Sequence, residues 1–210
     1  MTDERPEQPD TPQRRQFLKH TLLSTLGLGL LGGALHTLKN ASQSYAPPDR
    51  ARRGLIRPPG SLAENDFLSQ CIRCQRCSEI CESRAIRLFG AGTGVHEATP
   101  YIVPETRACT LCLKCGEVCP TGAIAKLTDK SEASMGEAVV DERLCVSHDN
   151  TGICGACFTM CPLRGKAIKQ GLHNRPYVNA DVCVGCGLCE EVCIVKGDKA
   201  IRVISNREWS

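Results

Sequence analysis

Aromatic side chains are scarce in this sequence. Phe, Tyr and Trp together make up 4% of its 210 residues, so the large side chains that usually fill a core are few. A chain of this length has room for one or two domains, yet the obvious apolar core is thin. We therefore expect something other than side chains to fill part of the interior.

The sequence also lacks the residue patterns that most enzymes need. No Ser, His and Asp stand in a recognisable catalytic context, and no pair of acid-base residues stands out. Gly90, Gly92 and Gly94 would suit a phosphate-binding loop, but no strand-loop-helix context surrounds them, which favours a hairpin loop. We predict no catalytic residue.

Cysteine, in contrast, is abundant. Residues 109–120 read C-x2-C-x2-C-x3-C-P, the spacing with which bacterial ferredoxins hold 4Fe-4S clusters. A similar four-cysteine pattern occurs three more times, and we number these motifs one to four in chain order. The sixteen predicted cluster ligands are Cys71, Cys74, Cys77 and Cys81 in motif one, Cys109, Cys112, Cys115 and Cys119 in motif two, Cys145, Cys154, Cys157 and Cys161 in motif three, and Cys183, Cys186, Cys189 and Cys193 in motif four.

This spacing follows from what an iron-sulfur cube needs. Two residues between cysteines let the backbone curl so that successive thiolates point into one concavity, and the fourth cysteine starts a short helix that points away. In two-cluster ferredoxins that fourth cysteine binds the other cluster, so motifs work in pairs. Sixteen thiolates match four 4Fe-4S clusters with none left over.

Two pairings of the motifs are open. The segment between Cys161 and Cys183 is the shortest connection and hairpin-like segments join neighbours, which favours adjacent pairs, one with two and three with four. The C-P ending occurs only in motifs two and three, which favours a nested arrangement. Adjacent pairing gives four ligand sets by the crossing rule: Cys71, Cys74, Cys77 and Cys119; Cys109, Cys112, Cys115 and Cys81; Cys145, Cys154, Cys157 and Cys193; Cys183, Cys186, Cys189 and Cys161.

Two other uses of cysteine fit less well. Four-thiolate zinc sites usually come as two separated C-x2-C pairs, whereas here three cysteines fall within seven residues. A disulfide framework is disfavoured because cysteines three apart on a tight turn bridge poorly.

The formal net charge of +3 counts every cysteine as neutral. Each oxidised cube with four thiolates carries two negative charges, so four clusters would add roughly minus eight. The loaded protein would be acidic, which removes the electrostatic support for nucleic-acid binding.

The N-terminal 45 residues are predicted to be an export signal. Arg14 and Arg15 are followed by Phe-Leu-Lys and by a moderately apolar run at 21–38, a pattern that resembles a twin-arginine signal. Export of a folded protein also suits clusters that are inserted in the reducing cytoplasm. No good cleavage site follows, so an uncleaved membrane anchor stays an alternative.

The rest of the chain reads as a linker and two modules. Prolines and arginines at 46–60 predict an extended, solvated linker, and Ser61 with Glu64 predicts a capping box for a helix at 62–70. Strands are expected at 85–89, 101–103, 123–127, 137–140, 167–169, 176–178 and 200–204. We predict an α+β fold of two tandem dicluster ferredoxin-like modules, residues 61–136 and 137–210, with short strands and one-turn helices around four clusters.

Motif three departs from the others. Eight residues, 146–153, separate Cys145 from Cys154 where two would be expected. We predict a loop that bulges beside that cluster, with His148 and Asp149 at a solvated tip.

The twin-arginine pattern, the segment RPPGSLAENDFLSQCIRC at 57–74 and the four motifs together resemble the NapG/MauM family of ferredoxin-type proteins over nearly the whole chain. The resemblance implies a periplasmic protein of nitrate reduction or methylamine utilisation that is not itself an enzyme. It would pass electrons from a membrane-bound quinol-oxidising ferredoxin-type protein to a periplasmic redox acceptor such as a cytochrome or reductase.

Two other functions fit the sequence. One is the iron-sulfur subunit of a molybdopterin oxidoreductase, although such subunits often leave on their partner's signal. The other is a cysteine-rich structural or assembly module, which would be colourless when purified.

Overall fold

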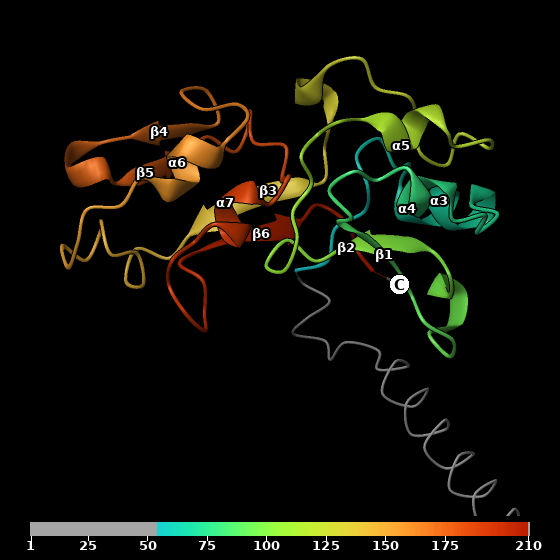
Figure 1. Ribbon diagram of the computed structural model, residues 1–210, viewed down its shortest axis with the longest axis horizontal. Helices are drawn as coiled ribbons and strands as arrows, with labels where there is room; N and C mark the ends of the chain where they lie inside the picture. The colour runs from blue at the N-terminus through green and yellow to red at the C-terminus, as the bar shows by residue number, and fades with distance from the viewer. Residues whose placement is uncertain (1–53, 210) are drawn as a thin grey trace, which may run out of the picture. The chain divides into compact units, whose positions relative to one another are not determined.

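The computed structural model describes residues 54–209 (Figure 1). The predicted export signal, and the linker as far as residue 53, lie outside the described residues. The described residues group as one compact unit. No helix within 54–209 is long and apolar enough to cross a membrane.

The secondary structure consists of short pieces that alternate along the chain. The helices are α3 (Glu64–Gln70), α4 (Arg76–Glu79), α5 (Lys114–Glu117), α6 (Ala156–Met160) and α7 (Leu188–Glu191), with 3-10 turns η1 (Gly94–His96), η2 (Lys130–Glu132) and η3 (Leu172–Asn174). The strands are β1 (Ile86–Leu88), β2 (Pro100–Ile102), β3 (Gly136–Val140), β4 (Ile168–Gln170), β5 (Pro176–Val178) and β6 (Ile201–Ser205). This is a mixed α and β fold, as the sequence predicts.

Each half of the described chain contains an inner hairpin. β1 pairs antiparallel with β2, with Ile86 opposite Ile102. β4 pairs in the same way with β5, with Ile168 opposite Val178. The first residue of β1, Ile86, and the first residue of β4, Ile168, are buried, and the residue after each is exposed. One face of each hairpin therefore packs on the core.

An outer strand pair accompanies each hairpin. In the second half β3 and β6 pair antiparallel over five residues, from Gly136 opposite Ser205 to Val140 opposite Ile201. In the first half the equivalent contact is only a bridge between Ser61 and Ile124. In this bridge the Leu62 N–H donates a hydrogen bond to the carbonyl oxygen of Ala123 at 3.0 Å.

The predicted strand at 123–127 is wrong. That segment and β3 follow one another in sequence, which suggested a hairpin, but they belong to different halves. The segment lies against residues 60–62, where the Ala125 N–H donates to Gly60 at 2.7 Å, and β3 takes the distant β6 as its partner. The other predicted strands are confirmed to within one or two residues at their ends.

The predicted capping box is also wrong, and the linker prediction fails at its C-terminal end. α3 begins at Glu64 with no side-chain cap, because the Ser61 hydroxyl donates to the Pro58 carbonyl and Glu64 binds Arg57. Arg57 is fully buried, as are Leu55 and Ile56. Residues 55–57 are therefore part of the core and not a solvated tether.

Buried apolar residues and cysteines form one contiguous core. Ile56, Phe67 and Ile102 are fully buried, and cysteines of motifs one, two and four lie in the same cluster of packed side chains. Thiols therefore form part of the interior beside the aliphatic groups.

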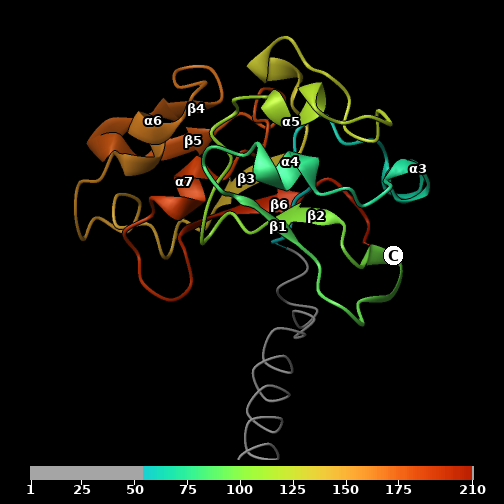
Figure 2. The ribbon, with the colours of Figure 1, turned by 45° about the vertical axis from the view of Figure 1, so that its right-hand side comes forward.

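The end of the described chain returns to the first half. The Arg207 guanidinium donates to the carbonyl oxygens of Ser61 and Leu62, and the Trp209 ring lies 4.6 Å from the Arg57 guanidinium carbon. Figure 2 shows β6, from which this tail continues, beside β1 and β2. The tail ties the last strand to the segment that leads into motif one.

Candidate metal centres

The cysteine loops of motifs one, two and four are curled by left-handed residues on both sides of their second cysteine. Arg73 and Gln75 flank Cys74 with φ of 58° and 66°. The equivalent residues are Leu111 and Leu113 in motif two and Gly185 and Gly187 in motif four. This conformation turns the chain back on itself twice, so that three thiols face one concavity. It costs a non-glycine residue about 1–2 kcal/mol, and no residue pattern in motifs one and two indicates it.

The turn after motif one forms without proline. Glu82 stands where the ferredoxin pattern has proline, but the Arg84 N–H donates to the Cys81 carbonyl oxygen at 3.0 Å and closes the turn. Arg84 has a φ of 51°, the left-handed conformation that Gly122 adopts after motif two.

The fold brings the sixteen cysteines together in four groups, each drawn from two motifs. Group A (Cys71, Cys74, Cys77, Cys119) lines one cavity, group C (Cys183, Cys186, Cys189, Cys161) a second, and group D (Cys145, Cys154, Cys157, Cys193) a third. Group B comprises Cys109, Cys112, Cys115 and Cys81. These are the sets that adjacent pairing of the motifs gives, with the fourth cysteine exchanged between partners.

In group B the thiols lie within range of one another's charge. Burial is the main reason that the pKa of Cys115 is raised to about 11, and the charges of Cys112 and Cys81 add to the increase. Cys81 therefore stands beside the thiols of motif two, as the crossing rule predicts.

The groups are paired within each half. α4 packs on α5, and α6 packs on α7, so motif one faces motif two and motif three faces motif four. Burial first, and then the charge of Cys115, raise the pKa of Cys77 to about 12, so groups A and B are close. Cys189 of group C likewise feels the charge of Cys157 in group D.

Burial raises the pKa of several of these thiols and so favours their neutral form when no metal is bound. Burial is the largest cause that raises the pKa of Cys109 to about 12 and those of Cys157 and Cys186 to about 11. Burial also opposes ionisation of Cys119, but hydrogen bonds from the Ile124 N–H and from Thr121 outweigh it and lower the pKa. Iron would have to displace protons from these thiols, so cluster binding releases protons and is coupled to folding.

The donor set fits an iron-sulfur cube. All sixteen cysteines are free thiols, and backbone N–H groups point at several sulfurs, such as Ala138 at Cys183 and Leu111 at Cys109, both at 3.4 Å. Such N–H···S bonds stabilise thiolate ligands and tune cluster potentials. Within 54–209, no three Cys, His, Asp or Glu side chains converge closely enough for a single metal ion. The thiols surround cavities instead.

The inserted loop in motif three is less solvated than predicted. The Ser147 side chain is fully buried. Its hydroxyl oxygen accepts the Cys154 N–H at 2.9 Å and lies 3.2 Å from the Cys154 carbonyl. The His148 ring packs edge-on against Tyr177 and contacts the Pro176 carbonyl. Only Asp149 of the two predicted tip residues is exposed.

Sequence reasoning missed several polar residues that shape the site. Ser147 closes the inserted loop of motif three by hydrogen bonding to Cys154. Arg57 anchors the segment that leads into motif one. Glu190 is buried beside Cys189, and its carboxylate accepts the Val203 N–H at 2.7 Å. Burial is the main reason that its pKa is raised to about 7. No sequence pattern marks a single serine, arginine or glutamate as buried beside a metal centre.

Known protein families cover all four cysteine motifs. The family described as 4Fe-4S dicluster domain matches residues 70–123 and 108–164, and the family described as 4Fe-4S binding domain matches residues 176–196. The chain is therefore a ferredoxin-type iron-sulfur protein, a class that transfers electrons. The two dicluster matches overlap at motif two, so they do not decide between the pairings.

Similar proteins narrow the class. The chain is 34% identical to the methylamine utilization ferredoxin-type protein MauM of Methylobacillus flagellatus, over 93% of this chain and 85% of the relative. It is 34% identical to the ferredoxin-type protein NapG of Escherichia coli, over 91% and 85%. MauM of Methylorubrum extorquens is also 34% identical, over 93% and 90%. The chain belongs to the NapG/MauM family of ferredoxin-type proteins, as its motifs predict.

Proposed function

We propose that groups A to D each hold one 4Fe-4S cluster and that the chain relays electrons through the four clusters. The observation that carries this proposal is the sorting of all sixteen cysteines into four sets of four, three of which line separate cavities. No cysteine is left over for another use. Cysteine ligation of every iron would leave no open position for a substrate, which suits a carrier and not an enzyme.

The protein's own residues bind, shield and tune the centres. Each cavity would supply four thiols from two motifs, and burial of thiols such as Cys115 and Cys189 would keep solvent away from the iron. N–H groups of Ile124 and Ala138 donate to sulfur and would favour the more negatively charged, reduced state of a bound cluster. A bound 4Fe-4S cluster supplies reversible one-electron chemistry at a potential that these features set.

The relay would run from a membrane-bound quinol-oxidising ferredoxin-type protein to a periplasmic cytochrome or reductase. Membership of the NapG/MauM family supports this placement, and so does the predicted twin-arginine signal. Whether the route serves nitrate, methylamine or another substrate depends on the partner and not on the described residues.

The test combines metal analysis of the anaerobically purified protein with an assay of its reduction and reoxidation. Iron and acid-labile sulfide should each be about sixteen per chain. Membranes that contain the partner and reduced quinol should bleach the visible absorption, and a periplasmic fraction should restore it. Stoichiometric zinc, a colourless protein, or clusters that neither quinol membranes nor the periplasmic fraction alter would contradict the proposal.

The periplasmic location has its own test. Changing Arg14 and Arg15 together to Lys should trap cluster-loaded protein in the cytoplasm, because the export machinery recognises the arginine pair. A matched control changes Arg52 and Arg53 to Lys, which keeps the same charge in the predicted linker. Equal recovery of both variants from the periplasm would defeat the signal assignment.

A further inference from the structure

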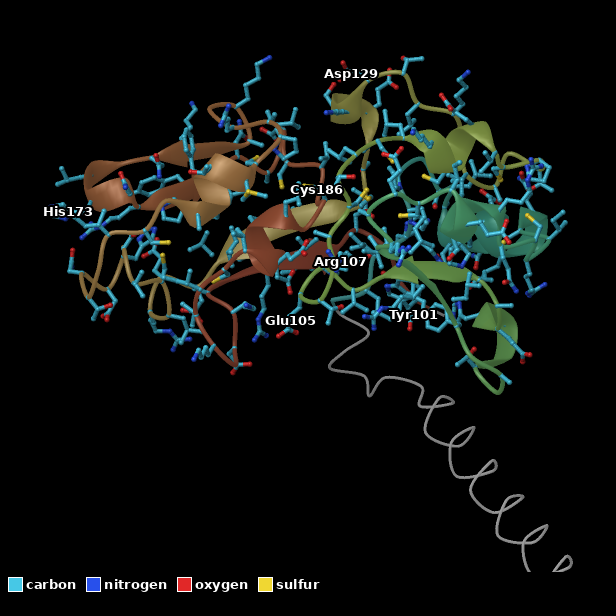
Figure 3. All side chains as sticks on the ribbon, in the orientation of Figure 1. Tyr101, Glu105, Arg107, Asp129, His173 and Cys186 are labelled. Carbon is cyan, nitrogen blue, oxygen red and sulfur yellow. The ribbon has the colours of Figure 1, made fainter. Side chains whose placement is uncertain are left out.

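The two halves of the described chain are joined by a hydrogen bond between two cysteines that belong to different groups. The N–H of Cys109, in group B, donates to the carbonyl oxygen of Cys186, in group C, at 3.0 Å. Both cysteines are 8% exposed. Figure 3 shows Cys186 in the middle of the described residues, in the same region as Arg107.

Close backbone approaches surround this contact. The Met135 N–H donates to the Val184 carbonyl oxygen at 3.1 Å. A Cβ on Gly185 would lie 2.5 Å from the carbonyl oxygen of Gly136, and one on Gly187 would lie 2.5 Å from Cβ of Pro104. The left-handed glycines of motif four therefore have a second role: a side chain at Gly187 would force the halves apart, and one at Gly185 would displace β3 from motif four.

A glutamate fastens the same contact from the side. Glu191, at the end of α7, accepts the Ala108 N–H at 2.8 Å, and its other oxygen lies 4.0 Å from the Arg107 guanidinium. Ala108 immediately precedes Cys109. Glu191 thus fixes the position of Cys109 relative to motif four.

We propose that electrons pass between the two halves through the Cys109–Cys186 contact, that the groups work in the spatial order A, B, C, D, and that Glu191 is the positioning residue of this crossing. The inference rests on the proposed function. The order follows because α4, with Cys77 of group A, packs on α5, with Cys115 of group B. The Cys109 N–H of group B bonds the Cys186 carbonyl oxygen of group C, and α7, with Cys189 of group C, packs on α6, with Cys157 of group D.

The step itself is simple. One electron leaves a reduced cluster in one half and arrives at an oxidised cluster in the other, with no bond formed or broken. Electron tunnelling falls steeply with distance and is aided by a bonded path, so the crossing should occur where the ligands touch. The spatial order differs from the order of the motifs in sequence, because motif four and not motif three faces motif two.

The chain offers a matched control for Glu191. Glu117 occupies the same position in motif two, two residues after the third cysteine, but it is exposed. Glu191→Ala removes the acceptor for the Ala108 N–H, Glu191→Gln keeps an acceptor oxygen without the charge, and Glu117→Ala leaves the contact alone. All three changes are made in the four-cluster holoprotein.

Two measurements test the crossing. The first is pulsed EPR on the dithionite-reduced protein, which reports how strongly spins in one half speed the relaxation of spins in the other. The second is flash photoreduction from a ruthenium complex on the exposed His173, with freeze-quench EPR following the electron from the second half to the first. EPR signals are assigned to groups with single cysteine variants.

Glu191→Ala should weaken the spin coupling between halves and slow the crossing about tenfold, because a loosened support lets the ligands drift apart. Coupling between A and B should not change. Glu191→Gln should restore most of the rate, and Glu117→Ala should match the wild type. Unchanged coupling and rate in Glu191→Ala would overturn its positioning role.

The wild-type protein gives a test that needs no variant. If groups B and C are not the most strongly coupled pair between the halves, the proposed order is overturned, even where Glu191→Ala fails to hold iron. If B and C are coupled as expected but no acceptor is reduced, the proposed relay fails and the crossing stands. If the wild type relays electrons while Glu191→Ala crosses normally, the relay stands and the positioning role fails.

Discussion

A single arginine shows how much of this fold depends on polar contacts. Arg57 is fully buried, and its guanidinium binds the Glu64 carboxylate, the Thr99 hydroxyl at 2.9 Å and the Pro100 carbonyl oxygen. It also lies 4.4 Å from the centre of the Phe67 ring. One side chain therefore joins the segment before motif one, helix α3 and the strand before motif two.

Replacing Arg57 with Ala should weaken the first half. The change leaves the buried Glu64 carboxylate with the His96 ring at 3.5 Å and Arg207 at 3.8 Å but without its closest partner, and loss of one partner of a buried ion pair costs about 3–5 kcal/mol. The measurement is the guanidinium midpoint for loss of the visible cluster absorption under anaerobic conditions. We compare midpoints and not free energies, because cofactor loss makes unfolding irreversible.

Arg87→Ala is the matched control, since Arg87 is exposed on β1 and should shift the midpoint little. Arg57→Lys should fall between the two, because lysine keeps the charge but not the planar fork that binds a carboxylate at two points. An Arg57→Ala midpoint equal to that of Arg87→Ala would show that the buried pair contributes nothing.

At the scale of single elements, the inserted loop of motif three depends on Ser147. Ser147→Ala removes the acceptor of the buried Cys154 N–H, and an unsatisfied buried donor costs about 1–3 kcal/mol. We expect the cluster held by group D to be lost first when a chelator is added, while the other three stay. EPR during the chelator titration measures the order of loss.

Asp149→Ala, in the same loop, provides the comparison, because Asp149 is exposed. Its chelator titration should match that of the wild type. Loss of all clusters together in Ser147→Ala would mean that the loop does not stabilise group D separately.

The C-terminal tail gives another prediction at this scale. Arg207→Ala removes two charged hydrogen bonds to the carbonyl oxygens of Ser61 and Leu62, each worth about 1.5–3 kcal/mol. The first half should become less stable, although residue 207 follows the last motif. We expect the clusters of groups A and B to be lost at a lower guanidinium concentration than those of groups C and D.

The adjacent Glu208 is exposed and serves as the control. Glu208→Ala should lose its clusters in the same order and at the same midpoint as the wild type. If Arg207→Ala destabilises groups C and D instead, the tail supports its own half and not the first.

Which elements could be predicted from sequence depends on how local their causes are. The cysteine loops and the hairpins β1–β2 and β4–β5 depend on residues close in sequence, so spacing and alternation revealed them. The β3–β6 pair joins residues more than sixty positions apart, and nothing local distinguishes it from a hairpin with 123–127. The left-handed conformation of leucines and arginines in the cysteine loops could not be predicted, because only glycine is a sequence signal for that conformation.

The polar residues of the site were hidden for a related reason. Ser61 and Glu64 fit a capping box by spacing, but Arg57 offers the carboxylate a stronger, buried partner. The four cysteine motifs could be predicted because their chemistry demands fixed spacing, but the pairing that sorts their cysteines into groups stayed open. Glu191 could not be predicted, because it acts across the two halves, and Glu117 has the same position in its own motif with a different role.

At the scale of the whole molecule, the pairing of motifs decides how the clusters are arranged. In this fold Cys119 completes group A with three cysteines of motif one, and Cys193 completes group D with three cysteines of motif three. A nested arrangement would instead place Cys193 with motif one and Cys119 with motif three. Paired substitutions distinguish the two, because two changes in one group cost one cluster and changes in separate groups cost two.

The variant Cys71→Ala with Cys119→Ala should therefore lose one 4Fe-4S cluster, since both thiols belong to group A. Cys71→Ala with Cys193→Ala should lose two, from groups A and D. Under nesting the two results are exchanged. Mössbauer spectroscopy of anaerobically reconstituted protein counts intact cubes directly, and it separates them from three-iron remnants that three cysteines can retain. Because each double variant removes the same number of thiols, a difference between them reports group membership and not a general loss of cysteine.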